Sequence, residues 1–400
     1  MQAVSIGLSM TAFPVFLDSI ESDFGATRTQ MSFGVPLVVA SGALVSPWIG
    51  RSVDRGSPRR VMICGAFVMM LGLVGLSAAT SLIAATAAWV CLVGTGQAML
   101  GPLPSMTVIA NWFVNRRATM IAIAAMGTTF GGGVVPPIAE WLIRVAGWRG
   151  AVFWMGMATV SLGVPIVWFG IRKSPEEIGA FPDGAAEPPP PDPVVSDESA
   201  TRDILGDYRF WPVTGAFALL LGLGVAFLTH LLPLSDEKGI PREVAVGLLS
   251  VAALGSALGK LAFGALTDRL GPRRALFIGV AVQMFSWGGL IASSEPVFFG
   301  VSTAGFAFGM GCTVPIQAGF VAMLFGRSRF GRATGLIGLF SLVGVFGLGP
   351  LIGWGYDETG NYVLPMSLAL VAIALPALLV AFVRFEPALV DEYREPSAAR

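Results

Sequence analysis

One lysine, Lys260, lies inside an apolar stretch, residues 243–266, that is long enough to form a membrane-spanning helix. It precedes Asp268 by eight residues, which corresponds to about 12 Å along a helix. An ionisable side chain at such a depth is costly and usually faces a polar cavity. Its ammonium group is therefore a candidate for binding an anionic solute. The alternative is that the side chain only extends to the membrane surface.

Three other polar side chains lie in apolar stretches. Gln97 and Gln317 occupy roughly equivalent places in the two halves of the chain, and each amide must be hydrogen-bonded in a dry bilayer. Bonds to a neighbouring helix and contact with a solute are both open for them. His230, the single histidine, ends the stretch 209–233. An imidazole titrates near neutral pH, which makes His230 a candidate for proton coupling, although a histidine near an interface commonly has no special role.

Two loops of the chain carry the same pattern of glycine, aspartate and arginine 214 residues apart. The shared residues are Gly50, Asp54, Arg55, Arg59 and Arg60 in the first loop and Gly264, Asp268, Arg269, Arg273 and Arg274 in the second. An Arg-Ala-Thr tripeptide recurs at 117–119 and 332–334, and Pro136 recurs as Pro350. Three matches at nearly one offset indicate a duplicated unit.

The chemistry of this loop motif suggests a latch. A glycine allows two helices to approach closely, and an aspartate such as Asp54 can lie at the positive N-terminal end of a neighbouring helix. The arginines can pair with carboxylates or lipid phosphates. We expect the motif to hold the two halves together on one face and to release them during a rocking motion. The alternative, that the arginines only fix the membrane orientation, leaves the recurring Asp54 and Asp268 without a use.

The composition excludes most other classes of protein. The chain has 400 residues, of which 54% are hydrophobic and 12% charged, and its mean hydropathy is +0.74. So much apolar surface cannot be hidden in one soluble core. Equal numbers of basic and acidic residues, 25 each, give no electrostatic footprint for nucleic acid. We find no pattern for a bound metal, nucleotide or other cofactor, and no cluster suited to a membrane enzyme.

Runs of apolar residues predict twelve membrane-spanning helices in an all-α fold. Their approximate positions are 1–18, 30–50, 60–79, 82–110, 117–143, 149–171, 209–233, 243–266, 274–293, 296–325, 332–354 and 361–384. Loops and ends on one side hold 19 of the 25 Lys and Arg residues and those on the other side hold 5, with Lys260 left out because it lies within a span, so the first side and both termini should be cytoplasmic. The proline-rich and acidic segment 172–208 divides the spans six and six and should be a solvated linker.

The predicted organisation is therefore two pseudo-symmetric six-helix bundles. The first bundle spans 1–171 and the second spans 209–384. The linker 172–208 joins them, and 385–400 form a cytoplasmic tail. We expect a multi-pass protein of the cell membrane, in a bacterium the inner membrane, that works as a monomer in the lipid bilayer.

The duplicated loop, Gly-x-x-x-Asp-Arg-x-Gly-x-Arg-Arg, resembles the signature of the major facilitator superfamily, except that Ser57 replaces the second glycine in the first copy. Several other short motifs resemble the branch of monocarboxylate transporters and oxalate/formate exchangers. They are Gly94-Thr95-Gly96-Gln97, Trp112-Phe113, Arg116-Arg117-Ala118, Gly127, Gly131-Gly132-Gly133, Pro136-Pro137, Gly147-Trp148-Arg149 and Ser174-Pro175-Glu176-Glu177-Ile178-Gly179. The resemblance covers the whole chain and implies the major facilitator fold.

The resemblance also implies roles for single residues. In that family the residue four before the loop glycine of the eighth span is an arginine that holds the substrate carboxylate, and Lys260 occupies this position. Monocarboxylate transporters have a first-span lysine where this chain has Thr11. They also have an eighth-span aspartate where this chain has Ser256. Thr11 is thus a candidate for substrate contact, and coupling to protons through that aspartate does not carry over.

The expected function is secondary or facilitated transport of a small solute by alternating access. The solute is expected to be an organic anion such as a monocarboxylate, carried alone or with a co-transported or exchanged ion. One alternative is a proton-coupled transporter of a drug or sugar-like substrate. Another is a membrane sensor that does not transport.

Overall fold

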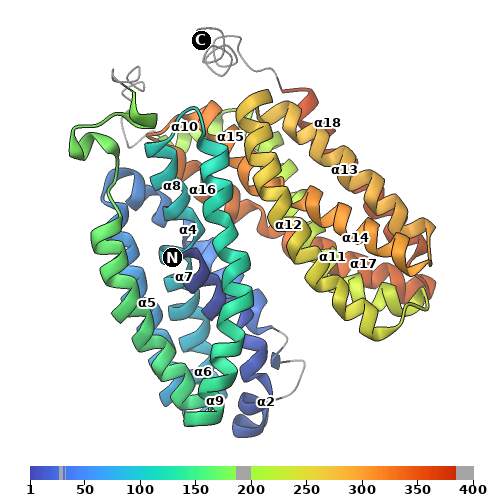
Figure 1. The fold of residues 1–400 in the computed structure, drawn as a ribbon, viewed down its shortest axis with the longest axis horizontal. Helices are drawn as coiled ribbons and strands as arrows, with labels where there is room; N and C mark the ends of the chain where they lie inside the picture. Colours follow the sequence, from blue (N-terminus) through green and yellow to red (C-terminus); the bar gives the residue numbers. More distant parts are fainter. Residues whose placement is uncertain (27–29, 32, 186–199, 384–400) are drawn as a thin grey trace. The chain divides into compact units, whose positions relative to one another are not determined.

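In the computed structural model, all regular structure of the described residues is helical (Figure 1). The structure describes residues 1–26, 30–31, 33–185 and 200–383. The helices are α1 (Gln2–Ile6), η1 (Gly7–Thr11), α2 (Phe13–Phe24), α4 (Gly34–Arg55), α5 (Pro58–Ala78), α6 (Leu82–Ala87), η2 (Ala88–Val93), α7 (Gly94–Leu100), α8 (Pro102–Trp112), α9 (Arg117–Gly170), η3 (Pro175–Ile178), η4 (Pro182–Gly184), α10 (Ala200–Gly206), α11 (Phe210–Glu237), α12 (Arg242–Leu270), α13 (Pro272–Ala292), α14 (Pro296–Met310), α15 (Thr313–Phe325), α16 (Phe330–Phe340), α17 (Leu342–Thr359) and α18 (Val363–Ala381).

The predicted spans correspond to these helices. Among the described residues, nine helical stretches are long and apolar enough to cross a membrane, and one of them, α9, has 54 residues. Gly147, with φ 70° and ψ 169°, breaks α9 into two consecutive spans, as the sequence predicts. The apolar helix Gln2–Leu17 and the 22-residue helix α4 complete the twelve. The first helix continues beyond the predicted end at residue 18, because α2 runs to Phe24 and ends at the left-handed Gly25.

The described residues form two compact units. Unit 1 takes those within Met1–Trp112, Ala124–Asp192 and Arg327–Leu339. Unit 2 takes those within Phe113–Ile123, Pro193–Gly326 and Phe340–Arg400. Each unit therefore contains one short segment from the other sequence repeat: Arg327–Leu339 in unit 1 and Phe113–Ile123 in unit 2.

The same helix pairs pack in both units. In unit 1, α4 and α5 pack against α7, and in unit 2 the equivalent α12 and α13 pack against α14. The first span of each half meets the fifth through a glycine: Gly131 lies against the backbone of Ala3, and Gly344 lies against the backbone of Ala218. Small residues at such crossings let two backbones approach closely. The sequence repeat is thus a repeat of packing contacts.

This packing predicts opposite effects for two neighbouring glycines of α9. A Cβ at Gly131 would lie 2.9 Å from Ala3 Cα, whereas a Cβ at Gly133 would meet no atom within 4 Å. Gly131→Ala should therefore lower the free energy of unfolding by about 1–3 kcal/mol. The control Gly133→Ala should be neutral or slightly stabilising, because alanine favours helix. Thermal unfolding in detergent measures both, and equal midpoints would contradict the proposed contact.

Candidate functional site

Asp54, near the end of α4, binds the start of α16. Its two carboxylate oxygens accept the backbone N–H groups of Gly331 and Arg332, each at 2.8 Å. These are the second and third residues of α16, and the first N–H groups of a helix have no partner within the helix. The carboxylate also lies at the positive end of the helix dipole. Asp54 thus stabilises a helix start that is 277 residues away in the chain.

Asp268 repeats this geometry in unit 2. Its carboxylate accepts the backbone N–H groups of Ala118 and Thr119 at 2.9 and 2.8 Å, at the second and third residues of α9. The helix that each aspartate binds comes from the other sequence repeat. The sequence predicts an aspartate at a helix N-terminus, but it does not say which helix.

The glycines of the motif make these contacts possible. A methyl group at Gly50 would meet the backbone of Gly331, and one at Gly264 would meet the backbone of Thr119. The two motif copies differ at the turn that follows. Gly271 has φ 81°, which favours glycine, whereas Ser57 at the equivalent position has φ −109°. The replacement of glycine by Ser57 therefore costs no backbone strain.

The arginines of the motif divide into two groups. Arg59 donates to the carbonyl oxygen of Trp168 at 3.2 Å, and Arg273 donates to that of Ala381 at 2.8 Å. Both bonds reach the last turn of the sixth span of the same half, where carbonyl groups are unpaired and a cation is favourable. These bonds were not predicted from the sequence. The only signal for them was that the two arginines recur 214 residues apart. The remaining arginines have exposed side chains: Arg55, Arg60, Arg269 and Arg274.

Lys260 lies on α12 in unit 2 with a partly buried side chain. Its backbone packs against Gly311, because a Cβ at Gly311 would meet the nitrogen of Lys260 and the carbonyl oxygen of Ser256. Gly311 lies between α14 and α15, where the tenth span is interrupted. Lys260 is thus a cation within a candidate span, Gly247–Leu270, beside an interruption of a neighbouring span.

The other predicted polar residues are distributed over the two units. Thr11 lies in unit 1, at the end of the π-turn η1, where its hydroxyl donates to the carbonyl of Gly7 at 3.0 Å. That hydroxyl also lies 3.5 Å from the carbonyl oxygen of Gly131. Gln97 is buried in α7 of unit 1 with its amide oxygen close to Gly42, and Gln317 is buried in α15 of unit 2.

His230 is buried in α11 of unit 2 and uses both ring nitrogens. Nε2 lies 3.0 Å from the carbonyl oxygen of Gly349, which can only accept a hydrogen bond. Nε2 therefore carries the proton in the neutral ring, and Nδ1 accepts the hydroxyl of Tyr362 at 3.0 Å. A second proton on the ring would require the Tyr362 hydroxyl to turn away. No feature of the sequence indicated Tyr362 as the partner of His230.

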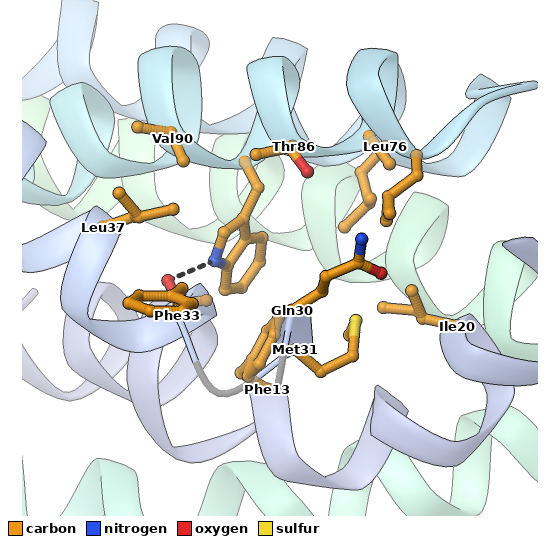
Figure 2. Close-up of a pocket in the computed structure, with 13 residues that line it drawn as sticks. Phe13, Ile20, Gln30, Met31, Phe33, Leu37, Leu76, Thr86 and Val90 are labelled. Carbon is orange, nitrogen blue, oxygen red and sulfur yellow. Dashed lines mark hydrogen bonds between the residues drawn. The ribbon is translucent and has the colours of Figure 1, made fainter. Parts of the chain in front are cut away.

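Unit 1 also contains a pocket of about 330 Å³ (Figure 2). Its walls come from α2, α4, α5, α6 and η2, and the indole N–H of Trp89 donates to the carbonyl of Gly34 beside it at 3.1 Å. Besides the indole of Trp89, the polar side chains among its described lining residues are those of Gln30 and Thr86, and the other lining residues are apolar. Among the described residues, no group of three His, Cys, Asp or Glu could hold a metal ion.

The family model of the Major Facilitator Superfamily matches residues 1–255 and 232–399. The chain belongs to the Major Facilitator Superfamily. It is 24% identical to monocarboxylate transporter 13 of Bos taurus, in an alignment that covers 88% of this chain and 80% of that protein. It is 26% identical to the gallate transporter of Pseudomonas putida, with 94% of this chain and 87% of that protein covered.

Solved structures show the same fold. The fucose:proton symporter of E. coli matches with a TM-score of 0.70 and 12% identity, over 95% of this chain and 96% of that chain. The proton:xylose symporter XylE matches with a TM-score of 0.70 and 13% identity, over 96% of this chain and 94% of that one. Fold and family confirm the predicted twelve-helix facilitator. The chain is thus a multi-pass membrane transporter of a small solute, and such transporters are not enzymes.

The carboxylate of Asp54 should control the start of α16. In Asp54→Asn one oxygen is replaced by an amide nitrogen that cannot accept a hydrogen bond, and the charge is lost. A charge-assisted bond is worth about 1.5–3 kcal/mol, so the amide hydrogens of Gly331 and Arg332 should exchange roughly ten- to a hundredfold faster. Hydrogen–deuterium exchange mass spectrometry measures this.

The control for this prediction is Glu140→Gln, which neutralises an exposed carboxylate of α9 that forms an ion pair with Arg144 at 3.1 Å. It should leave the exchange of both amides unchanged. Wild-type exchange in Asp54→Asn would show that the carboxylate is not needed there.

Proposed function

We propose that this facilitator carries a small organic anion, such as a monocarboxylate, by alternating access. The observation that carries the proposal is Lys260, a partly buried cation within the candidate span of α12. Facilitators bind their substrates near the middle of the bilayer, and an ammonium at that depth attracts a carboxylate. The similarity to a gallate transporter and to monocarboxylate transporters supports the same class of solute. Thr11, Gln97 and Gln317 are the proposed polar contacts to the solute.

Two alternatives receive no comparable support. The fucose and xylose symporters share the fold at 12–13% identity, which says nothing about sugars in this chain. The similarity to monocarboxylate transporters and to a gallate transporter gives no support to a sensor without transport. Uptake into proteoliposomes of a panel of carboxylates and neutral solutes separates these functions.

Lys260 should distinguish anions from neutral solutes. Lys260→Gln should raise the substrate concentration for half-maximal uptake of a carried carboxylate roughly ten- to a hundredfold, since one charge-assisted contact is lost. Lys260→Arg keeps the charge and should retain activity. The assay compares the carboxylate with a neutral analogue that is also carried. Equal effects on both would mean that Lys260 supports the fold or the motion, and an unchanged concentration for half-maximal uptake would mean that it does not touch the solute.

We also propose that His230 couples transport to protons. Its ring is buried and its neutral tautomer is fixed by Gly349 and Tyr362, so that protonation of Nδ1 must turn the Tyr362 hydroxyl away while the Nε2 bond to Gly349 is kept. His230→Gln should therefore abolish the acceleration of uptake by an inward proton gradient while exchange of solute persists. Tyr362→Phe, which leaves the imidazole in place, should keep part of the acceleration. Full acceleration in His230→Gln would assign coupling to another group.

In the proposed membrane arrangement both termini lie in the cytoplasm. In a bacterium, the membrane that the protein spans would be the inner membrane. We propose bundles of 1–171 and 209–384, the linker 172–208 and the tail 385–400, working as a single chain. The bias of 19 basic residues against 5, with the intramembrane Lys260 left out, supports this orientation. Residues 186–199 of the linker and 384–400 lie outside the described residues.

A reporter fused at two positions tests this orientation. Fusion at Asp192, which lies outside the described residues, should give a cytoplasmic signal, and fusion at Asp357, near the end of α17, should give an external one. Alkaline phosphatase and green fluorescent protein fusions report the two sides with opposite signals. An external signal at Asp192 would overturn the proposed orientation.

A further inference from the structure

The first residues of the linker bind near both partners of the Asp54 contact, which are the end of α4 and the start of α16. The ammonium of Lys173 donates to the backbone carbonyl of Asp54 at 3.2 Å. The backbone carbonyl of Lys173 accepts the amide N–H of Asn111 at 3.2 Å, and that of Arg172 accepts the indole N–H of Trp112 at 3.2 Å. The linker start is thus fixed to the ends of α4 and α8.

The other side of the contact is held through Arg327, three residues before α16. Its Nη2 donates to the backbone carbonyl of Asn111 at 2.6 Å and to Oε1 of Glu176 at 3.2 Å. The side chain of Arg327 is 19% exposed and that of Glu176 is 41% exposed. One guanidinium therefore joins the chain before α16 to α8 and to the linker.

These bonds close a ring. From Asp54 it runs to Gly331, back along the chain to Arg327, on to Asn111, then to Lys173, and returns to Asp54. Glu176 adds a second connection between Arg327 and the linker. The start of α16 can therefore leave both α4 and α8 only after the bonds of Asp54 and those of Arg327 have all broken.

The electrostatics of Glu176 favour its charged form. Burial opposes ionisation, but hydrogen bonds from the Ser174 side chain and its own backbone N–H, together with the Arg327 guanidinium, hold the pKa of Glu176 below its usual range. The carboxylate is therefore ionised at neutral pH and available to Arg327.

The sequence repeat, with its offset of 214, places residue 387 at the position equivalent to Lys173. This residue lies outside the described residues.

We propose that Lys173 and Glu176 are positioning residues of the Asp54 contact: the start of the linker holds the segment Arg327–Leu339 in unit 1 and sets how often α16 separates from α4. The linker thereby takes part in the conformational cycle of the transporter. This inference depends on observed contacts and not on the identity of the solute, so that it can fail while the proposed function stands.

The test is hydrogen–deuterium exchange on the full-length protein in lipid nanodiscs. Glu176→Gln and Lys173→Met should each raise exchange in the peptide covering Arg327–Leu339 about two- to fivefold, the range expected for partly exposed charge pairs. The peptide covering Phe113–Ile123, which Asp268 binds in unit 2, should not change. Raising the salt concentration from about 0.02 M to about 0.5 M should raise the exchange of Arg327–Leu339 in the wild type close to that in Glu176→Gln, because salt screens the ion pair of Glu176 with Arg327.

Two further variants complete the test. In the double variant of Lys173→Met and Glu176→Gln, the fold increase in exchange should be smaller than the product of the two single fold increases, since both residues act on one ring. Glu140→Gln, which breaks the exposed pair of Glu140 with Arg144 at 3.1 Å, should change nothing in Arg327–Leu339.

The proposal is overturned if both single variants keep wild-type exchange in Arg327–Leu339 while Asp54→Asn raises it. It is also overturned if exchange rises equally in Phe113–Ile123, because the two residues would then support the fold in general. Multiplicative effects in the double variant would mean that no ring connects them.

Discussion

The structure depends on the unpaired backbone N–H groups at two helix starts. In water these groups would bind solvent, but Gly331, Arg332 and Ala118 are buried, so that their N–H groups need a partner from the chain itself. Asp54 supplies it for α16, and Asp268 supplies it for α9. Each bond pair joins residues of different sequence repeats. This explains why Arg327–Leu339 groups with unit 1 and Phe113–Ile123 with unit 2.

Duplication gives each half the same solutions to the same physical problems. Arg59 and Arg273 each pair with carbonyl groups at the end of the sixth span of their own half. Gly131 and Gly344 each let the fifth span approach the first. The copies differ where a local constraint differs, as at Ser57 and Gly271, whose backbones have φ of opposite sign. Similar halves with separable contacts suit a transporter that alternates between two states.

The candidate span Gly247–Leu270 contains a cation, Lys260. A cation within a span is costly unless a polar surrounding or an anion compensates it. The resemblance noted from the sequence implies that Lys260 takes the place of an arginine, and that Thr11 and Ser256 take the places of charged residues. The proposed binding of a carboxylate depends on this charge of Lys260. The imidazole of His230, the group proposed to couple transport to protons, is buried and has both ring nitrogens hydrogen-bonded.

The sequence by itself determined the number of spans, the duplication and the motif residues, because apolar length, glycine spacing and a recurring Asp-Arg pair are local features. It also predicted that Asp54 would bind a helix start. Only the tertiary structure decided which start, since backbone N–H groups carry no sequence signature and the partner lies 277 residues away. For the same reason, the sequence missed Tyr362 beside His230, the carbonyl groups that Arg59 and Arg273 reach, and the ring through Arg327 and Lys173.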